Sequence, residues 1–269
     1  TGNTGQKLYP VFPVRYLPLK LTHFEIFQTI WRPIVTPSQL PTSPDAHDVA
    51  RSLLAADCVQ VRTDEPFRLP SGWASPVYMN CRKLISFPEI RKKLVRQALT
   101  LLEERQCLQG LTAVTGAEAS GIALAAWIAD ALDLPLQYVR KQTKGIGPDS
   151  QIVGVIRPGE HVLLVDDLMA GGHSKYNCCR ALLGSGATLK DIFVIFDYGA
   201  FPTKSFLDAM NIRLHALATW HDILAVARED ARFGTRELNE LETFLADPVR
   251  WSYDHGGISS VQIDTKGIL

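Results

Sequence analysis

Residues 161–175 hold the side chains of this chain that are best suited to chemistry. They read HVLLVDDLMAGGHSK, so a short apolar run is followed at once by two carboxylates, Asp166 and Asp167, and then by a glycine-bearing turn that leads into a helix. Two adjacent acids are costly to bury unless they bind something, and sugar hydroxyls or a cation would satisfy both. The backbone N–H groups of the turn and the positive end of the helix suit a phosphate.

The same residues allow other interpretations. Asp167 could only cap the turn while Asp166 faces solvent, or His173 could join the two acids in binding a metal ion. The metal interpretation is the weaker one, because a lone histidine in a loop more often forms hydrogen bonds or faces water. The pattern alone favours ligand binding by the two acids.

The elements that must position these acids alternate along the chain from residue 45 onward. Apolar stripes predict helices from residue 45, at 86–110, with Ser86 to Glu89 as a capping box and Gly110 at the end, and at 122–132, 175–183, 221–228 and 235–246. Short apolar runs predict strands at 59–61, 77–79, 111–115, 136–139, 162–165, 192–196 and 214–218. This order predicts an α/β fold, with a mostly parallel twisted sheet covered by helices on both faces.

Residues 1–45 differ from the rest because they contain seven of the sixteen prolines. Proline at that density prevents long helices and central strands, so we expect an irregular N-terminal arm. Its aromatic residues argue against a fully solvated tail, and we expect it to pack on the domain or on a second subunit. The folded domain is then expected to span residues 46–269.

Composition excludes several classes of function. The 269 residues include 28 basic and 28 acidic side chains, so the overall charge predicts attraction neither to nucleic acid nor to a membrane. Apolar runs stay far below the roughly 18 residues that cross a bilayer. The five cysteines show no metal-ligand spacing, which favours a reduced, cytoplasmic protein. Adjacent Cys178 and Cys179 fall on a predicted helix and are expected to pack in the core.

Residues 162–174 resemble the phosphoribosyl diphosphate signature of type I phosphoribosyltransferases, and three more segments are similar to the orotate phosphoribosyltransferases. Residues 67–88 (FRLPSGWASPVYMNCRKLISFP) resemble the N-terminal hood of that family. Residues 116–122 (GAEASGI) resemble its diphosphate-binding loop, and residues 138–145 (YVRKQTKG) its mobile catalytic loop. The similarity runs from about residue 45 to 257 and leaves out the arm.

The resemblance implies the type I phosphoribosyltransferase fold with a small hood, and a Mg²⁺-dependent transfer of phosphoribose from phosphoribosyl diphosphate to orotate. It assigns catalytic roles to Asp166, Asp167, Lys144 and Arg140. The substrate-binding residues that it implies are Lys141, Ala170, Gly171, Gly172, His173, Ser174, Glu118, Ser120 and Tyr78. Mg²⁺ usually keeps waters and binds substrate phosphates, so no protein ligand is assigned to it. A cytoplasmic homodimer is also implied.

The chain departs from the family pattern at several positions. Ile146 stands where the catalytic loop usually has a histidine, Ala170 replaces a hydroxyl residue, and His173 replaces a small residue. Ser120, Pro70 and Tyr198 stand where many members have basic side chains. Two further hypotheses therefore stay open: a relative that uses another nitrogenous base, and a nucleotide-binding protein without turnover. Without the resemblance, residues 140–144 would be interpreted as a solvated hairpin.

Overall fold

The computed structural model describes residues 45–142, 151–230 and 232–260. These residues belong to one compact unit, Val35–Leu269. The predicted arm lies outside the described residues apart from Asp45, and so do Lys144 and Ile146 of the expected catalytic loop. The arm and its packing remain predictions.

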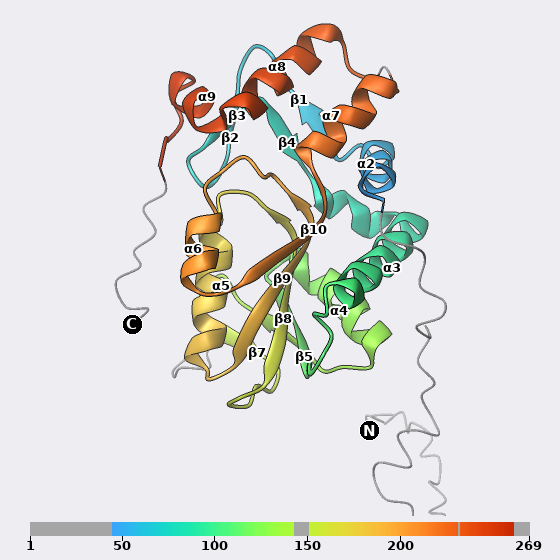
Figure 1. Cartoon of the computed structure of the whole chain (residues 1–269), viewed down its shortest axis with the longest axis vertical. Helices are drawn as coiled ribbons and strands as arrows, with labels where there is room; N and C mark the ends of the chain where they lie inside the picture. The colour runs from blue at the N-terminus through green and yellow to red at the C-terminus, as the bar shows by residue number, and fades with distance from the viewer. Residues whose placement is uncertain (1–44, 143–150, 231, 261–269) are drawn as a thin grey trace, which may run out of the picture. The chain divides into compact units, whose positions relative to one another are not determined.

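A six-stranded sheet forms the centre of the described chain, in the order β10-β9-β8-β5-β6-β7 (Figure 1). All neighbouring pairs are parallel except β6 with β7. The strands span Arg213–Thr219 (β10), Thr188–Asp197 (β9), His161–Met169 (β8), Ala113–Ala117 (β5), Leu136–Val139 (β6) and Ile152–Val153 (β7). The nearly continuous burial of β8 and β9 fits strands that are covered on both faces, and the predicted α/β fold is confirmed.

Helices cover both faces of this sheet (Figure 1). On one face lie α3 (Pro88–Glu104) and α4 (Ser120–Leu132), which pack with Leu163 and Val165 of β8. On the other face lie α5 (His173–Gly184) and α6 (Lys204–Ala209), which pack with Val162 and Leu164. Successive residues of β8 therefore alternate between two separate hydrophobic cores, as the pleat of a strand requires.

A small hood of two antiparallel strand pairs stands beyond the carboxyl ends of the strands. In it β1 (Val59–Val61) pairs with β4 (Val77–Met79), and β2 (Phe67–Arg68) pairs with β3 (Ala74–Ser75), both antiparallel. The chain then continues through the short helix η2 (Cys81–Ser86) into α3. The remaining helices are α2 (Ala46–Ala55), α7 (Trp220–Glu229), α8 (Thr235–Ala246) and α9 (Pro248–Asp254).

Hydrogen bonds fasten the hood to distant parts of the chain. The backbone N–H of Ala74 donates to Ser252 Oγ of α9 at 3.0 Å. The backbone N–H of Met79 donates to Tyr198 Oη, just after β9, at 3.0 Å. Burial raises the pKa of Tyr198, and its ring is 2% exposed. The hood is thus held by buried contacts to the C-terminal helices and to the sheet.

Several boundaries differ from the sequence-based expectations. Helix α3 ends at Glu104, well before Gly110, and its N-cap is Phe87 rather than Ser86, which closes η2 and forms no capping box. Strand β8 does not stop at Val165 but continues through both acids to Met169, because it stays paired with β9 to its end. The elements β2, β3, β7, α6 and α9 were not anticipated, since each is too short to show a periodic pattern.

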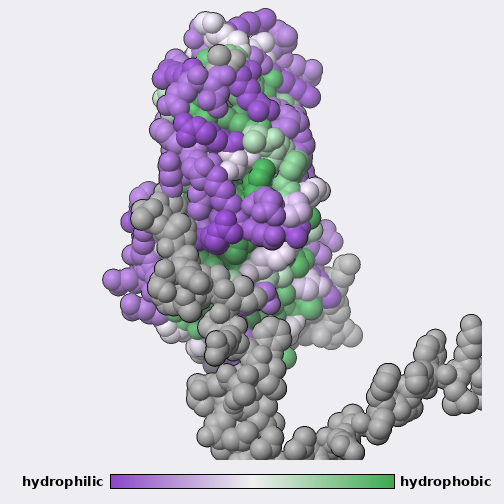
Figure 2. All heavy atoms as spheres, turned by 90° about the vertical axis from the view of Figure 1, so that its right-hand side faces the viewer, coloured by the Kyte–Doolittle hydropathy of each residue, from purple (hydrophilic) through white to green (hydrophobic). Residues whose placement is uncertain are grey.

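The helices on the side of α2 and α3 are amphipathic. Val49, Leu53 and Leu54 of α2 are buried, and so are Leu94 and Ala98 of α3. The outward face, seen in Figure 2, is mostly hydrophilic, with smaller groups of hydrophobic residues between the polar ones. In the described part of the chain, no helix has the length and apolarity needed to cross a membrane.

Candidate active site

The two acids lie where the chain reverses its direction of travel across the sheet. From β5 the chain proceeds through α4 to β6 on one side, and from β8 it proceeds through α5 to β9 on the other. In open α/β sheets, ligands bind at such a switch point, outside the carboxyl ends of the strands. The β5–β8 pairing ends at Gly116 and Val165, whereas β8 runs on beside β9. Asp166 and Asp167 follow immediately, at the crevice between β5 and β8.

Both carboxylates are buried, but they face opposite sides of β8. Asp166 is 4% exposed and Asp167 is 9% exposed, so the interpretation in which Asp166 faces solvent is wrong. Asp166 turns toward α4 and α5, where it accepts hydrogen bonds from Ser120 Oγ at 3.0 Å and from the backbone N–H of Asp167 at 2.8 Å. Asp167 turns toward η2 and α3 and accepts a bond from the backbone N–H of Leu168 at 2.9 Å.

Asp166 has a charged partner that the sequence reasoning did not identify. The ammonium of Lys175, on the first turn of α5, forms an ion pair with its Oδ2, and both side chains are almost fully buried. Burial alone would lower the pKa of Lys175, but Asp166 outweighs this effect, so the pKa stands above its ordinary value. A cation on the first turn of a helix opposes the helix dipole. That mismatch was the one sequence signal for a nearby anion.

Asp167 has no such partner among the described residues. Burial, and then the negative charge of Asp166, raise its pKa from 3.8 to about 6, although Lys175 acts in the opposite direction. Its carboxylate lines a small cavity with Ser120, Arg82 and Arg91. The two adjacent acids therefore differ in their electrostatic surroundings. Lys175 neutralises the charge of Asp166, whereas the charge of Asp167 is available to interact with a ligand in the crevice.

The loop after β8 packs tightly against two other segments. A Cβ on Gly171 would lie 2.8 Å from Ser71 Cβ of the hood, and a Cβ on Gly172 would lie 2.5 Å from Phe206 Cε1 of α6. Gly172 also has a φ of +81°, a conformation that side chains disfavour. Gly171 is therefore needed for packing, and Gly172 for packing and backbone conformation, in addition to any role beside a phosphate.

The other residues of this loop reach the start of α5. Ala170 packs against the core beneath the hood, whereas Ser174 is exposed. His173 is the first residue of α5 and is exposed, and its Nε2 lies 3.4 Å from Asn177 Nδ2 along the helix. In the described residues His173 belongs to no three-donor cluster with Asp166 and Asp167. The imidazole ring of His173 therefore lies along the surface of α5.

A hydrogen bond ties the expected diphosphate loop to the start of the expected catalytic loop. Strands β5 and β6 end side by side at Ala117 and Val139. Beyond them, Glu118 Oε2 accepts a bond from the backbone N–H of Lys141 at 2.8 Å. The backbone N–H of Arg140 donates to the Gln151 carbonyl at 2.8 Å, so both ends of the loop are fixed. Lys144 lies outside the described residues.

Tyr78 lies on β4 of the hood. Its hydroxyl accepts a hydrogen bond from Arg82 Nη2 at 3.0 Å, and its ring packs against Phe67 at 5.5 Å between centroids.

Of the residues expected at the site, the structure brings Asp166, Asp167 and Ser120 together at the crevice, with Gly171 against the hood beside them. It shows no contact of Tyr78 with that group.

Comparison with known proteins identifies similar chains. The orotate phosphoribosyltransferase of Dinoroseobacter shibae is 44% identical over 222 residues, which cover 80% of this chain and 98% of the relative. The crystal structure of orotate phosphoribosyltransferase from Aeropyrum pernix is 29% identical with a TM-score of 0.57, covering 66% of this chain and 97% of that one. The structure of Leishmania donovani UMP synthase, at 23% identity, shares the fold with a TM-score of 0.64 over 75% of this chain and 42% of that one. No model of a protein family matches the chain.

Proposed function

The chain belongs to the orotate phosphoribosyltransferase family, and on that premise we propose that its crevice between β5 and β8 binds phosphoribosyl diphosphate and transfers the phosphoribose to orotate. The products are orotidine 5′-phosphate and diphosphate, in de novo pyrimidine synthesis. The observation that carries the assignment of the site is the pair of buried carboxylates, Asp166 and Asp167, at a switch point of the sheet.

Asp167 is the acid that faces the reacting sugar. When the bond from the anomeric carbon to diphosphate breaks, the ribose acquires the positive charge of an oxocarbenium ion. A carboxylate stabilises that charge best where it is buried and not already paired. Asp167 meets both conditions within the described residues, whereas Lys175 occupies Asp166. Asp166 then positions the ribose site through Ser120 and the backbone of Asp167.

The leaving diphosphate is stabilised by the cations that follow β6. Arg140 and Lys141 stand at the carboxyl end of that strand, and the Glu118–Lys141 bond holds this segment against the loop after β5. Lys144 is proposed to join them when the catalytic loop covers the site, which also excludes water. The sugar 5′-phosphate is held by residues 170–174, where the first N–H groups of α5 have no carbonyl partner inside the helix.

The residues of the crevice fit a Mg²⁺ ion. They offer oxygen donors, and a cation beside the buried Asp167 would stabilise its charged form. The diphosphate oxygens of the substrate would hold the ion, and Asp167 would interact with it through a bound water. When bound, the ion neutralises charge on the leaving diphosphate.

Orotate is proposed to bind under the hood, on the side of Tyr78. The enzyme is proposed to act as a homodimer, in which loop cations also serve the neighbouring subunit. A reducing compartment such as the cytoplasm suits the five cysteines, all of which are free and buried.

Turnover of orotate tests the proposal. The full chain is mixed with orotate, phosphoribosyl diphosphate and Mg²⁺, and orotidine 5′-phosphate is measured. We expect Asp167→Asn to lower kcat by at least about 100-fold, because the substitution removes the negative charge that stabilises the cationic ribose in the transition state. Asp130→Asn, an exposed acid of α4, is the matched control and should keep full activity. If the protein turned over another base but not orotate, that base would be assigned as the acceptor. An unchanged kcat in Asp167→Asn would show that Asp167 does not have the proposed role.

A further inference from the structure

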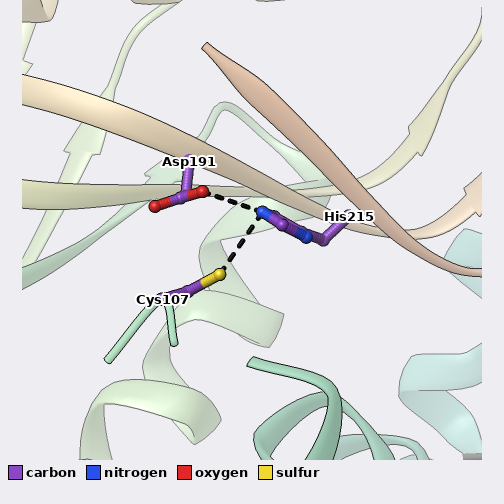
Figure 3. Close-up of side chains that lie close together, drawn as sticks. All are labelled: Cys107, Asp191 and His215. Atoms are coloured by element: carbon purple, nitrogen blue, oxygen red, sulfur yellow. Dashed lines mark hydrogen bonds and ion pairs between the residues drawn. The ribbon is translucent and has the colours of Figure 1, made fainter. Parts of the chain in front are cut away.

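Three metal-ligating side chains converge away from the crevice (Figure 3). Cys107 follows α3, Asp191 lies on β9, and His215 lies on β10. His215 Nε2 lies 3.3 Å from Cys107 Sγ and 2.8 Å from Asp191 Oδ1, and the three donor atoms all lie within 4.8 Å of one another. The residues are 1%, 2% and 9% exposed, respectively.

The thiol of Cys107 can donate to the Arg105 carbonyl at 3.6 Å, but that bond does not explain why the sulfur also lies beside the ring nitrogen of His215. A single ring nitrogen carries either one proton or one lone pair. If His215 Nε2 carries the proton, it donates to Asp191, and the sulfur receives at most a weak shared contact. If it does not, its lone pair faces the negative Asp191 oxygen. Both contacts point to the same nitrogen, as Figure 3 shows, whereas in a catalytic relay the two partners bind different ring nitrogens.

A metal ion would satisfy all three donors at once. Thiolate, imidazole and carboxylate are the ligands of Zn²⁺, which binds them at about 2.0–2.3 Å with tetrahedral angles, so ligand atoms stand about 3.4–3.6 Å apart. From the present separations, the His215–Cys107 pair at 3.3 Å must spread by about 0.1–0.3 Å, and the His215–Asp191 pair at 2.8 Å by about 0.6–0.8 Å. One thiolate and one carboxylate would neutralise the dication, while the charge of Arg213, which also pairs with Asp191, lies on a half-exposed guanidinium. We propose that Cys107, Asp191 and His215 bind one divalent cation of the zinc class, with water as the fourth ligand.

Binding requires the thiol to lose its proton to solvent, because the ligand is the thiolate. Burial, and then the charge of Asp191, raise the pKa of Cys107 to about 11 in the free protein, so uptake of the ion is expected to release one proton. Arg213, which is half exposed, also holds Asp191, with Nε at 2.8 Å from Oδ1 and Nη2 at 3.1 Å from Oδ2. It can keep the bond to Oδ2 and orient the carboxylate while Oδ1 binds the ion.

This cluster is separate from the crevice. Asp191 pairs in register with Leu163, three residues before Asp166 on β8, which is about 10 Å along the strand toward its amino end. The ion would join the segment after α3 to the last two strands of the sheet. We therefore assign it a structural role, so that its binding does not depend on turnover.

Cobalt titration of the full chain tests the site directly. Protein stripped with chelator is titrated with Co²⁺ alone, and the thiolate-to-cobalt charge-transfer absorption is followed. We expect one equivalent to bind with that absorption, Zn²⁺ to displace it, and Zn²⁺ to raise the Tm. Asp166 and Asp167 give no such band, but Cys81 lines the cavity beside Asp167, so Cys81→Ser is titrated in parallel and should keep the full absorption.

Variants separate the proposed site from other thiols. Cys107→Ser and His215→Gln should each weaken Co²⁺ binding by at least about 100-fold and remove the rise in Tm with Zn²⁺. Cys179→Ser, another fully buried cysteine, is the matched control and should bind as the parent does. Absence of the band in the parent protein, or an equal band in His215→Gln, would overturn the proposal and leave a hydrogen-bonded cluster without a metal. If Cys107→Ser does not fold, His215→Gln carries the test.

Discussion

Lys175 and Asp166 form a buried ion pair at the base of the crevice, while the next acid along the strand, Asp167, turns to the opposite side of β8. The pair is enclosed by α4 and α5, and Ser120 completes the hydrogen bonds of the carboxylate. An arrangement of this kind stabilises little by itself, but removal of one partner leaves an uncompensated buried charge.

We therefore predict that Lys175→Met destabilises the chain by about 3 kcal/mol, measured by chemical denaturation. Lys190→Met, at an exposed position of β9, should change the free energy of unfolding by less than about 0.5 kcal/mol. The double variant Asp166→Asn/Lys175→Met should recover part of the loss, because the charge that lacks a partner is gone. A loss in the double variant equal to the sum of the two single losses would contradict the coupling.

The stability of the substrate-free protein should depend on pH through Asp167. Because its pKa in the fold lies near 6, above the ordinary 3.8, its contribution to stability is present below pH 3.8 and is lost as the pH rises through about 6. Asp167→Asn should therefore raise the Tm more at about pH 7.5 than at about pH 4.5, and the gain in unfolding free energy should differ between the two pH values by on the order of 2 kcal/mol. Parallel thermal melts of Asp130→Asn give the reference, and a gain that is equal at the two pH values would refute the assignment.

The same shift predicts how activity responds to pH. If the ionised form of Asp167 stabilises the transition state, kcat/KM should fall as the pH decreases through about 6. The residual activity of Asp167→Asn should lack that limb. A profile of the parent enzyme that stays flat from about pH 7 to 5 would show that another group controls the reaction.

Apolar periodicity predicted the elements that form the sheet and its covering helices. The strand at Leu136–Val139 and the helix at Thr235–Ala246 agree residue for residue with the expectation, because burial on one or both sides leaves a regular pattern in the sequence. Two-residue strands such as β2 and β3 leave no such pattern.

Contacts between distant residues were beyond sequence reasoning. Cys107 and His215 are 108 positions apart, and Asp191 and His215 are 24 apart, so no ligand-spacing motif joins them. They meet only because β9 and β10 are neighbours. Their register places Asp191 beside Arg213, and His215 lies two residues after Arg213 on the same face of β10. The ion pair between Lys175 and Asp166 was not predicted for a similar reason, although the two adjacent acids could be recognised in the sequence.

Tyr198 should prove to be a structural link rather than a ligand of the substrate. Its buried hydroxyl accepts the backbone N–H of Met79, so Tyr198→Phe leaves that donor without a partner. We expect a loss of about 1–3 kcal/mol in unfolding free energy, with little change in the KM for phosphoribosyl diphosphate. Tyr253→Phe, at a ring that is 64% exposed, should be neutral. A large rise in KM without loss of stability would instead assign Tyr198 to the binding site.

Glycine at position 172 is required by backbone conformation and by packing together. A Cβ there would meet Phe206 at 2.5 Å in a backbone with φ of +81°, so Gly172→Ala should cost about 2 kcal/mol or more and displace the loop that we assign to the 5′-phosphate. The KM for phosphoribosyl diphosphate should rise as well. Gly184→Ala, at the other end of α5, meets nothing within 4 Å and should be neutral or stabilising. Equal melting temperatures of the two variants would show that α6 yields to the added methyl group, and that the conformational requirement at Gly172 is small.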